Sequence, residues 1–383
     1  MSEFQRILVL VGDPNEVTTR GGQPFFLLKA GKEMNFLHSG LALKPEKLRA
    51  YRYTWNLFSL ITKGEKGGFQ YSKAFLNKLI KQVNLGEEAV EFISYFPLLP
   101  PGEWKSNWRV NYYIDATLKQ NFEEYGLSNN VGEKVKEDAL RQELENYKFA
   151  ERIICRSRWA AASVVNKYGI HSNKVHFVLP GSSVDEKLID KIKPNNYPPL
   201  QPLRLGFIGK DWQRKRLPFL LQVAESLKSK KTAVEVVVIG SDCDSLPKSS
   251  LINCVGFIDK HKQMYNFMKL VQSFHFGCLF SSTEGTPQSI LECLRLGVPV
   301  LGTNAGGIPD SIPEGLGFVF ELDHSPEAIA DLLESFVNNP NEYYQLRDRV
   351  AARAEEFTWQ RTVEKFIKVW QGSEEFLYDA TKR

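Results

Sequence analysis

The sequence contains no long apolar run. None of its hydrophobic stretches approaches the ~20 residues that an α-helix needs to cross a bilayer. The N-terminus, MSEFQRILVLVGD, leads directly into a short strand-like run and lacks the small-residue cleavage site of a signal peptide. We therefore expect a cytoplasmic protein whose contact with a membrane, if any, is peripheral.

Cysteine and histidine are scarce and scattered. The five cysteines form no CxxC pair, and three of them lie in apolar, strand-like runs. This pattern indicates reduced core residues rather than a disulfide framework or a zinc site. The full set is Cys155, Cys243, Cys254, Cys278 and Cys293. The six histidines form no cluster, so we expect no histidine-based metal site.

Several common functional motifs are also missing. The chain has no P-loop, no Gly-x-Gly-x-x-Gly fingerprint, no Ser/His/Asp grouping and no nucleophile elbow. Nucleic-acid binding is not expected, because the pI is 8.6 and no basic-aromatic stripe is present. Residues 1–195 have a net charge of +6, whereas the whole chain has +4. This basic half could face an anionic acceptor or a membrane, or its lysines could simply be solvated.

Apolar strand-like runs alternate with helical stretches along the whole chain. This alternation is typical of βαβ units with a parallel sheet. A chain of 383 residues is too long for one ordinary core, and a polar, Pro- and Asn-rich stretch at 185–201 is the best linker. We predict an α/β protein with two Rossmann-like domains, residues 1–190 and 200–358, facing each other across a cleft at the carboxyl ends of their strands.

Two glutamates, Glu284 and Glu292, flank a predicted helix start. Residues 274–281 form a buried-strand pattern, 283–287 a turn with Pro287 at the first helical position, and 289–296 a helix. Backbone N–H groups at the helix start favour an anion, and the two carboxylates lie on about the same face. A sugar nucleotide fits this arrangement, and the alternative is an ordinary strand–turn–helix.

A basic loop follows the first strand of the second half. Gly209 permits a tight turn, and Lys210, Arg214, Lys215 and Arg216 place cations at the start of the next helix. Fixed cations can stabilise the negative charge that develops on a departing diphosphate. The alternative is a basic surface turn.

Two features of the first half could reach the same cleft. Gly21 and Gly22 follow the first strand, and a Gly-Gly pair lets backbone approach a ligand closely. Asp115 ends another predicted strand, where it could orient or deprotonate an acceptor hydroxyl. Equally, Asp115 could be the N-cap of a following helix.

The motifs around Glu284 resemble those of one enzyme family. The pattern Glu-Gly-x-Pro-x-x-x-x-Glu, then Gly-x-Pro-Val and Thr-x-x-Gly-Gly-Ile-Pro-Asp, is similar to the donor site of glycosyltransferase family 4, the glycosyl transferases group 1. The likeness is strong over about residues 203–320. It implies the two-domain GT-B fold and a retaining, metal-independent hexosyltransferase. It also implies that the C-terminal helix, about 360–383, packs back on the first domain.

The resemblance also implies residue roles. Glu284 would contact the transferred sugar, Glu292 the ribose hydroxyls, and Arg214 with Lys215 the diphosphate. Asp115 matches a region near the acceptor hydroxyl. The remaining donor-binding positions would be Gly21, Gly22, Gly209, Lys210, Ile258, Gly285, Thr286, Pro287, Gln288 and Ser289.

Partners and rival functions follow from the same resemblance. The nucleotide-diphosphate sugar is a substrate, and no cofactor is expected. The acceptor is a glycan, a lipid-linked glycan or a small metabolite. The Asp242-Cys243-Asp244 stretch is similar to the metal motif of another glycosyltransferase fold, but a lone Asp-x-Asp is common by chance and we expect no metal there. The alternatives are a non-catalytic sugar-nucleotide or glycan-binding protein, or an epimerase or phosphorylase of the GT-B fold.

Overall fold

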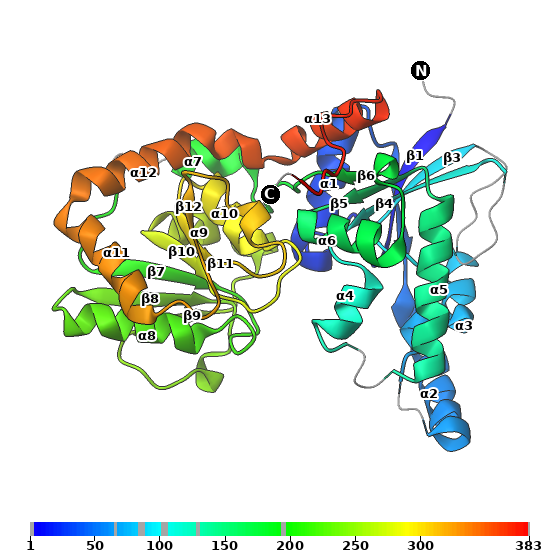
Figure 1. The fold of residues 1–383 in the computed structure, drawn as a ribbon, viewed down its shortest axis with the longest axis horizontal. Helices are drawn as coiled ribbons and strands as arrows, with labels where there is room; N and C mark the ends of the chain where they lie inside the picture. Colours follow the sequence, from blue (N-terminus) through cyan, green and yellow to red (C-terminus); the bar gives the residue numbers. More distant parts are fainter. Residues whose placement is uncertain are drawn as a thin grey trace. The chain divides into compact units, whose positions relative to one another are not determined.

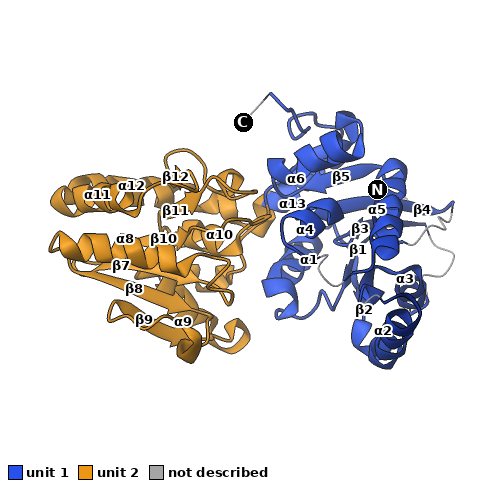
Figure 2. Ribbon diagram, turned by 60° about the horizontal axis from the view of Figure 1, so that its bottom comes forward, with its two compact units in different colours: residues 1–179, 362–383 blue, residues 180–361 orange. Residues whose placement is uncertain are grey.

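The computed structural model describes residues 4–64, 67–82, 89–100, 106–127, 131–192 and 197–381. The chain divides into two compact units (Figure 2). Unit 1 contains residues 1–179 and 362–383, and unit 2 contains residues 180–361. The division falls ahead of the predicted linker at 185–201. No helix among the described residues is long and apolar enough to span a bilayer.

Unit 1 is built on a six-stranded parallel sheet with the order β2-β1-β3-β4-β5-β6 (Figure 1). The strands are β1 (Gln5–Val11), β2 (Ser39–Leu43), β3 (Val90–Ser94), β4 (Trp108–Ile114), β5 (Arg152–Cys155) and β6 (Val175–Phe177). The helices are α1 (Gln23–Glu33), α2 (Arg49–Lys63), α3 (Lys73–Ile80), α4 (Leu118–Glu123), α5 (Glu133–Phe149) and α6 (Arg158–Ala162). Strand β3 is buried along its whole length, as expected for a parallel strand covered on both faces.

Unit 2 repeats this plan with the sheet order β12-β11-β10-β7-β8-β9. Its strands are β7 (Leu203–Ile208), β8 (Val234–Ile239), β9 (Ile252–Gly256), β10 (Phe276–Leu279), β11 (Val300–Thr303) and β12 (Gly317–Phe320). Its helices are α7 (Ile189–Ile192), α8 (Leu217–Ser229), α9 (Lys260–Gln272), α10 (Gln288–Arg295), α11 (Pro326–Asn338) and α12 (Pro340–Arg353). The predicted α/β fold class with two parallel sheets is confirmed.

The last helix, α13 (Trp359–Trp370), carries the chain back into unit 1. Phe366 is fully buried there, with its ring 4.9 Å from that of Tyr113 and 5.8 Å from that of Phe36. The indole N–H of Trp370 donates to Glu91 Oε1 at 2.7 Å. Residues from both ends of the chain therefore build one core.

One prediction about cysteine is wrong. Cys243 and Cys254 form a disulfide, whereas Cys155, Cys278 and Cys293 are free and buried as expected. The two bonded cysteines are 11 residues apart, and the turn after β8 returns the chain beside that strand. A search for CxxC spacing does not detect such a pair.

Candidate functional site

The two loops that carry the predicted catalytic residues of unit 2 follow adjacent strands. Strands β7 and β10 are hydrogen-bonded neighbours, with Leu205 opposite Phe276 and Gly206 opposite Gly277. Because both strands run in the same direction, the segments that follow them leave the same edge of the sheet. The fold therefore brings the basic loop and the Glu284 turn together.

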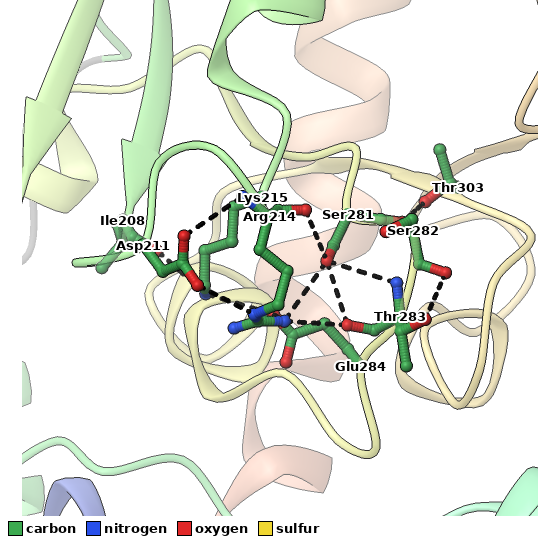
Figure 3. Close-up of polar contacts among 9 residues, drawn as sticks. All are labelled: Ile208, Asp211, Arg214, Lys215, Ser281, Ser282, Thr283, Glu284 and Thr303. Atoms are coloured by element: carbon green, nitrogen blue, oxygen red, sulfur yellow. Dashed lines mark hydrogen bonds and ion pairs between the residues drawn. The ribbon is translucent and has the colours of Figure 1, made fainter. Parts of the chain in front are cut away.

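Arg214 connects these two loops. Its Nη1 atom donates to the carbonyl oxygen of Thr283 at 2.8 Å and to Glu284 Oε1 at 3.0 Å (Figure 3). Its Nε atom donates to Asp211 Oδ2 at 3.3 Å. The guanidinium is therefore held in one orientation by contacts on both sides.

Lys215 adds a second cation to the same carboxylate. Its Nζ atom lies 3.5 Å from Glu284 Oε1 and donates to the carbonyl oxygen of Ile208 at 3.3 Å (Figure 3). A Cβ atom at Gly209 would collide with the aliphatic part of this lysine. Gly209 thus leaves room for the lysine to fold back across it, and a larger residue would push the Lys215 side chain aside.

The backbone of Glu284 is fixed by the Gly306-Gly307 turn. The N–H of Gly307 donates to the carbonyl oxygen of Glu284 at 2.7 Å. Gly306 has a φ of +57°, and a Cβ atom there would collide with that same carbonyl oxygen. The turn after β11 therefore positions Glu284, a contact that the sequence did not reveal.

The start of α10 has unused polar groups. The helix begins at Gln288, with Pro287 as its N-cap, so the predicted start was one residue late and Pro287 lies just outside the helix. No side chain caps this end. The hydroxyls of Thr286 and Ser289 are buried and have no hydrogen-bond partner within the described residues. Gly285 is buried beside them. Such an end suits an anionic or hydroxyl-bearing ligand.

The side chain of Gln288 is already engaged within unit 2. It accepts a hydrogen bond from Ser183 Oγ at 2.9 Å and donates to the carbonyl oxygen of Gly181 at 3.2 Å. Its contribution to a ligand would therefore come from the backbone N–H. These bonds attach Gly181 and Ser183 to α10 within unit 2.

Glu292 is fully buried on α10 and forms an ion pair with Lys260, the first residue of α9. Burial raises the pKa of the Glu292 carboxyl, and the charges of Lys260 and Lys215 oppose this effect. The ammonium of Lys260 also lies 4.0 Å from the ring centre of Phe267. Lys260 was missed in the sequence, because no local spacing links it to Glu292.

Lys210 and Ile258 lie apart from the Arg214–Glu284 contacts. Lys210 is exposed, with its Nζ atom 4.9 Å from the ring centre of Phe257. Ile258 follows β9 and is half-buried. Neither residue takes part in the hydrogen bonds and ion pairs drawn around Arg214, Lys215 and Glu284 (Figure 3).

In unit 1, Gly21 and Gly22 adopt positive φ angles of +68° and +88°. Such angles are accessible to glycine and strained for other residues, so the Gly-Gly pair is required by the turn itself. Gly22 is the residue that precedes α1. The predicted approach of this loop to a donor stays a prediction.

Asp115 follows β4, and its charge changes the pKa of a neighbouring group of unit 1, Tyr95. The pKa of Tyr95 is raised to about 12, mainly by burial. The charge of Asp115 adds to this rise, whereas Arg156 and Arg20 oppose it. Asp115 is not a helix N-cap, which corrects one of the two interpretations given above. The N-cap of α4 is Thr117, which forms a reciprocal capping box with Gln120.

Asp242 has a local structural role. Its carboxylate accepts the backbone N–H of Asp244 at 3.3 Å and caps a short 3₁₀ turn, and the intervening Cys243 is in the disulfide. The Asp-x-Asp pattern is thereby explained as a turn.

Comparison with known proteins agrees with the geometry of unit 2. Residues 189–357 match the family model described as Glycosyl transferases group 1. A D-inositol 3-phosphate glycosyltransferase of Corynebacterium urealyticum is 20% identical over 287 residues, covering 70% of this chain and 66% of the relative. An uncharacterized glycosyltransferase of Haemophilus influenzae is 25% identical over 173 residues, covering 43% and 47%. The chain thus spans about half to two thirds of these curated relatives.

Solved structures share the fold over nearly the whole chain. Anabaena Alr3699/HepE in complex with UDP and glucose has a TM-score of 0.61 at 13% identity, covering 96% of this chain and 100% of that protein. The sucrose-phosphate synthase of Thermosynechococcus elongatus has a TM-score of 0.61 at 14% identity, covering 96% and 98%. The protein therefore has the GT-B fold of glycosyltransferases. Within its second unit, residues 189–357 are similar to the Glycosyl transferases group 1 domain.

Proposed function

We propose that this protein is a retaining, metal-independent hexosyltransferase that uses a nucleotide-diphosphate sugar. One observation carries the proposal: Arg214, Lys215 and Glu284 meet at the adjoining ends of β7 and β10. The uncapped start of α10 follows directly in the chain. The two cations and the helix N-terminus suit the negative charge of a diphosphate, and the carboxylate suits the hydroxyls of the attached sugar.

Arg214 and Lys215 stabilise the leaving diphosphate. In the present structure both cations face Glu284, whose side chain is only 13% exposed: its carboxylate accepts a hydrogen bond from Arg214 and forms an ion pair with Lys215. A bound diphosphate competes for these cations and releases the Glu284 carboxylate to accept hydrogen bonds from sugar hydroxyls. The cations are then aimed at the oxygens on which charge develops, which is where electrostatic stabilisation accelerates a reaction.

The other donor contacts come from the elements around this cluster. Glu292 accepts hydrogen bonds from the ribose hydroxyls, and the charge of Lys260 favours its ionised form. The hydroxyls of Thr286 and Ser289 and the first N–H groups of α10 bind the sugar phosphates. Ile258 lies against the base. Asp115 of unit 1 orients the acceptor hydroxyl for front-face substitution.

The named relatives guide the choice of donor. The Anabaena protein was solved in complex with UDP and glucose. The Corynebacterium urealyticum relative is called an inositol phosphate glycosyltransferase. We therefore place uridine-diphosphate sugars first among the donors to test. The acceptor is a hydroxyl-bearing molecule whose class these names do not specify.

A thermal-shift screen of the full chain against nucleotide sugars tests the proposal. A ligand present at 100 times its Kd stabilises by about 2.7 kcal/mol, so a bound donor gives a clear rise in Tm. We expect this rise in EDTA, together with slow hydrolysis of the donor in the absence of an acceptor.

The Lys215→Ala variant should lower that hydrolysis by roughly 10²-fold, the usual loss when one group aimed at the transition state is removed. The matched control is Lys228→Ala, which removes an exposed lysine near the end of α8. Full hydrolysis in Lys215→Ala would contradict the assignment. Binding without any hydrolysis would instead indicate a non-catalytic sugar-nucleotide-binding protein.

A further inference from the structure

Helix α2 turns its apolar face away from unit 1. Six of the thirteen large apolar side chains that are exposed among the described residues lie on this one helix, and Phe58 and Ile61 are 65% and 75% exposed. At 100° per residue they occupy one arc of about 180°. The six are Tyr51, Tyr53, Leu57, Phe58, Leu60 and Ile61.

The opposite side of α2 attaches the helix to the unit. Ser59 is buried, and the ring of Trp55 packs 5.7 Å from that of Phe69. A surface helix of a folded domain normally buries its apolar stripe and exposes its polar one. Helix α2 has the reverse orientation, so its apolar face is open to a binding partner.

The charge around α2 identifies the occupant. Residues 44–82 carry nine Lys/Arg and two Asp/Glu, a net charge of +7, whereas the whole chain has only +4. Helix α2 itself contains Arg49, Arg52 and Lys63 and no acid. In both ribbon views α2 lies beside α3 (Figure 1, Figure 2). Lys78 of α3 lies with its Nζ atom 3.7 Å from the ring centre of Tyr51. An apolar face with a surrounding set of cations matches an anionic lipid surface.

A cavity opens at the first turn of α2. Its volume is about 660 Å³, and its lining includes Tyr53, three arginines (Arg20, Arg49 and Arg52) and one acid, Glu46. Arg20 belongs to the Thr19–Gly22 turn, which immediately precedes α1. The cavity therefore extends from α2 to this turn. Three arginines against one glutamate leave the lining positive, which suits the anionic head group of a molecule whose tail is apolar.

We propose that α2 docks the protein on an anionic membrane, with Phe58 and Ile61 inserted between the lipids and the surrounding lysines and arginines on the lipid phosphates. The acceptor is then an anionic lipid whose head group enters the cavity beside Arg49 and Arg52. The acceptor part rests on the proposed function, whereas the docking does not.

Co-sedimentation of the full chain with vesicles tests the docking. We expect binding to vesicles that contain phosphatidylglycerol, weaker binding at high salt, and little binding to pure phosphatidylcholine. The double variant Phe58→Glu/Ile61→Glu should bind at least about tenfold more weakly, because it removes two apolar side chains from the interface and adds two negative charges. Lys63→Glu should weaken binding and reduce its salt dependence.

The matched control is Phe149→Glu, which makes the same change at an exposed apolar side chain at the end of α5. It should bind vesicles like the unaltered protein. The double variant and Phe149→Glu should both keep the Tm of the unaltered protein and the rise in Tm with a nucleotide sugar. A failed docking proposal is therefore distinguishable from a failed donor assignment.

Three results would overturn the proposal. The first is no binding of the unaltered chain to anionic vesicles at low salt. The second is unchanged binding by the double variant. The third is a dimer in sedimentation equilibrium that the double variant abolishes, because a second copy of the chain would then cover the apolar face.

Discussion

Lys260 has a specific electrostatic task, since it neutralises a carboxylate that is removed from water. Replacing it by Met should cost about 2 kcal/mol or more at neutral pH, because Glu292 then stays buried without its cation. Adding Glu292→Gln should restore much of that loss, since the double variant has no unpaired charge. Urea unfolding of the two single variants and the double variant measures this coupling.

The loss in Lys260→Met should also depend on pH. Burial already raises the pKa of Glu292, and removing the opposing lysine raises it further. A carboxyl whose pKa is higher folded than unfolded makes the protein less stable as pH rises through that interval. The variant should therefore be least destabilised in acid and most destabilised at neutral pH. A loss that does not change with pH would show that Lys260 acts through packing alone.

The sequence specified some site residues better than others. Arg214, Lys215 and Glu284 each follow a buried strand, and adjacent parallel strands place such residues together, so their meeting could be inferred. The Lys260–Glu292 pair and the role of Gly306 depend on contacts between segments that no local pattern connects. The catalytic and binding roles themselves remain predictions.

At the scale of the element, the turn after β11 should control the position of Glu284. Gly306→Ala introduces a Cβ atom against the carbonyl oxygen of Glu284 and strains a φ of +57°. We expect a loss of about 2 kcal/mol in stability and at least tenfold weaker donor binding. Thermal shift and titration with a nucleotide sugar would measure the two effects.

Gly315→Ala is the matched control for that substitution. Gly315 has a φ of +80°, but no atom lies within 4 Å of the Cβ that would be added. Only the backbone strain of about 1 kcal/mol should appear, with donor binding unchanged. Equal effects of the two alanines on donor binding would contradict a positioning role for Gly306.

Elements with a strong burial pattern were predicted, and weakly patterned ones were not. The buried-strand pattern at 274–281 was recognised, and it contains β10, which is buried at every position. Strand β2 was missed, because its residues are mostly half-buried at the edge of the sheet and the sequence SGLAL has little periodicity. For a helix such as α2, a helical period in the sequence alone does not say which face meets the rest of the chain.

At the scale of the whole molecule, Phe366 should support unit 1 although it follows unit 2 in sequence. Phe366→Ala removes a fully buried ring and should cost about 3–5 kcal/mol. We expect hydrogen exchange to speed up in β4 and to stay slow in β7 and β10. Phe267→Ala, at a fully buried position of α9, is the control and should give the opposite pattern. Faster exchange in both units with either alanine would mean that they unfold as one.

The return of α13 also sets the order in which the protein is completed on the ribosome. Thr362, whose hydroxyl donates to the carbonyl oxygen of Leu179, is made 183 residues after its partner. Domains usually finish folding in the order of their synthesis. Here the domain that is begun first stays incomplete, with Phe36 and Tyr113 lacking their aromatic neighbour, until the other has been translated. Translation of residues 180–361 therefore separates the two parts of unit 1, and its rate sets how long the apolar surface that α13 covers stays exposed.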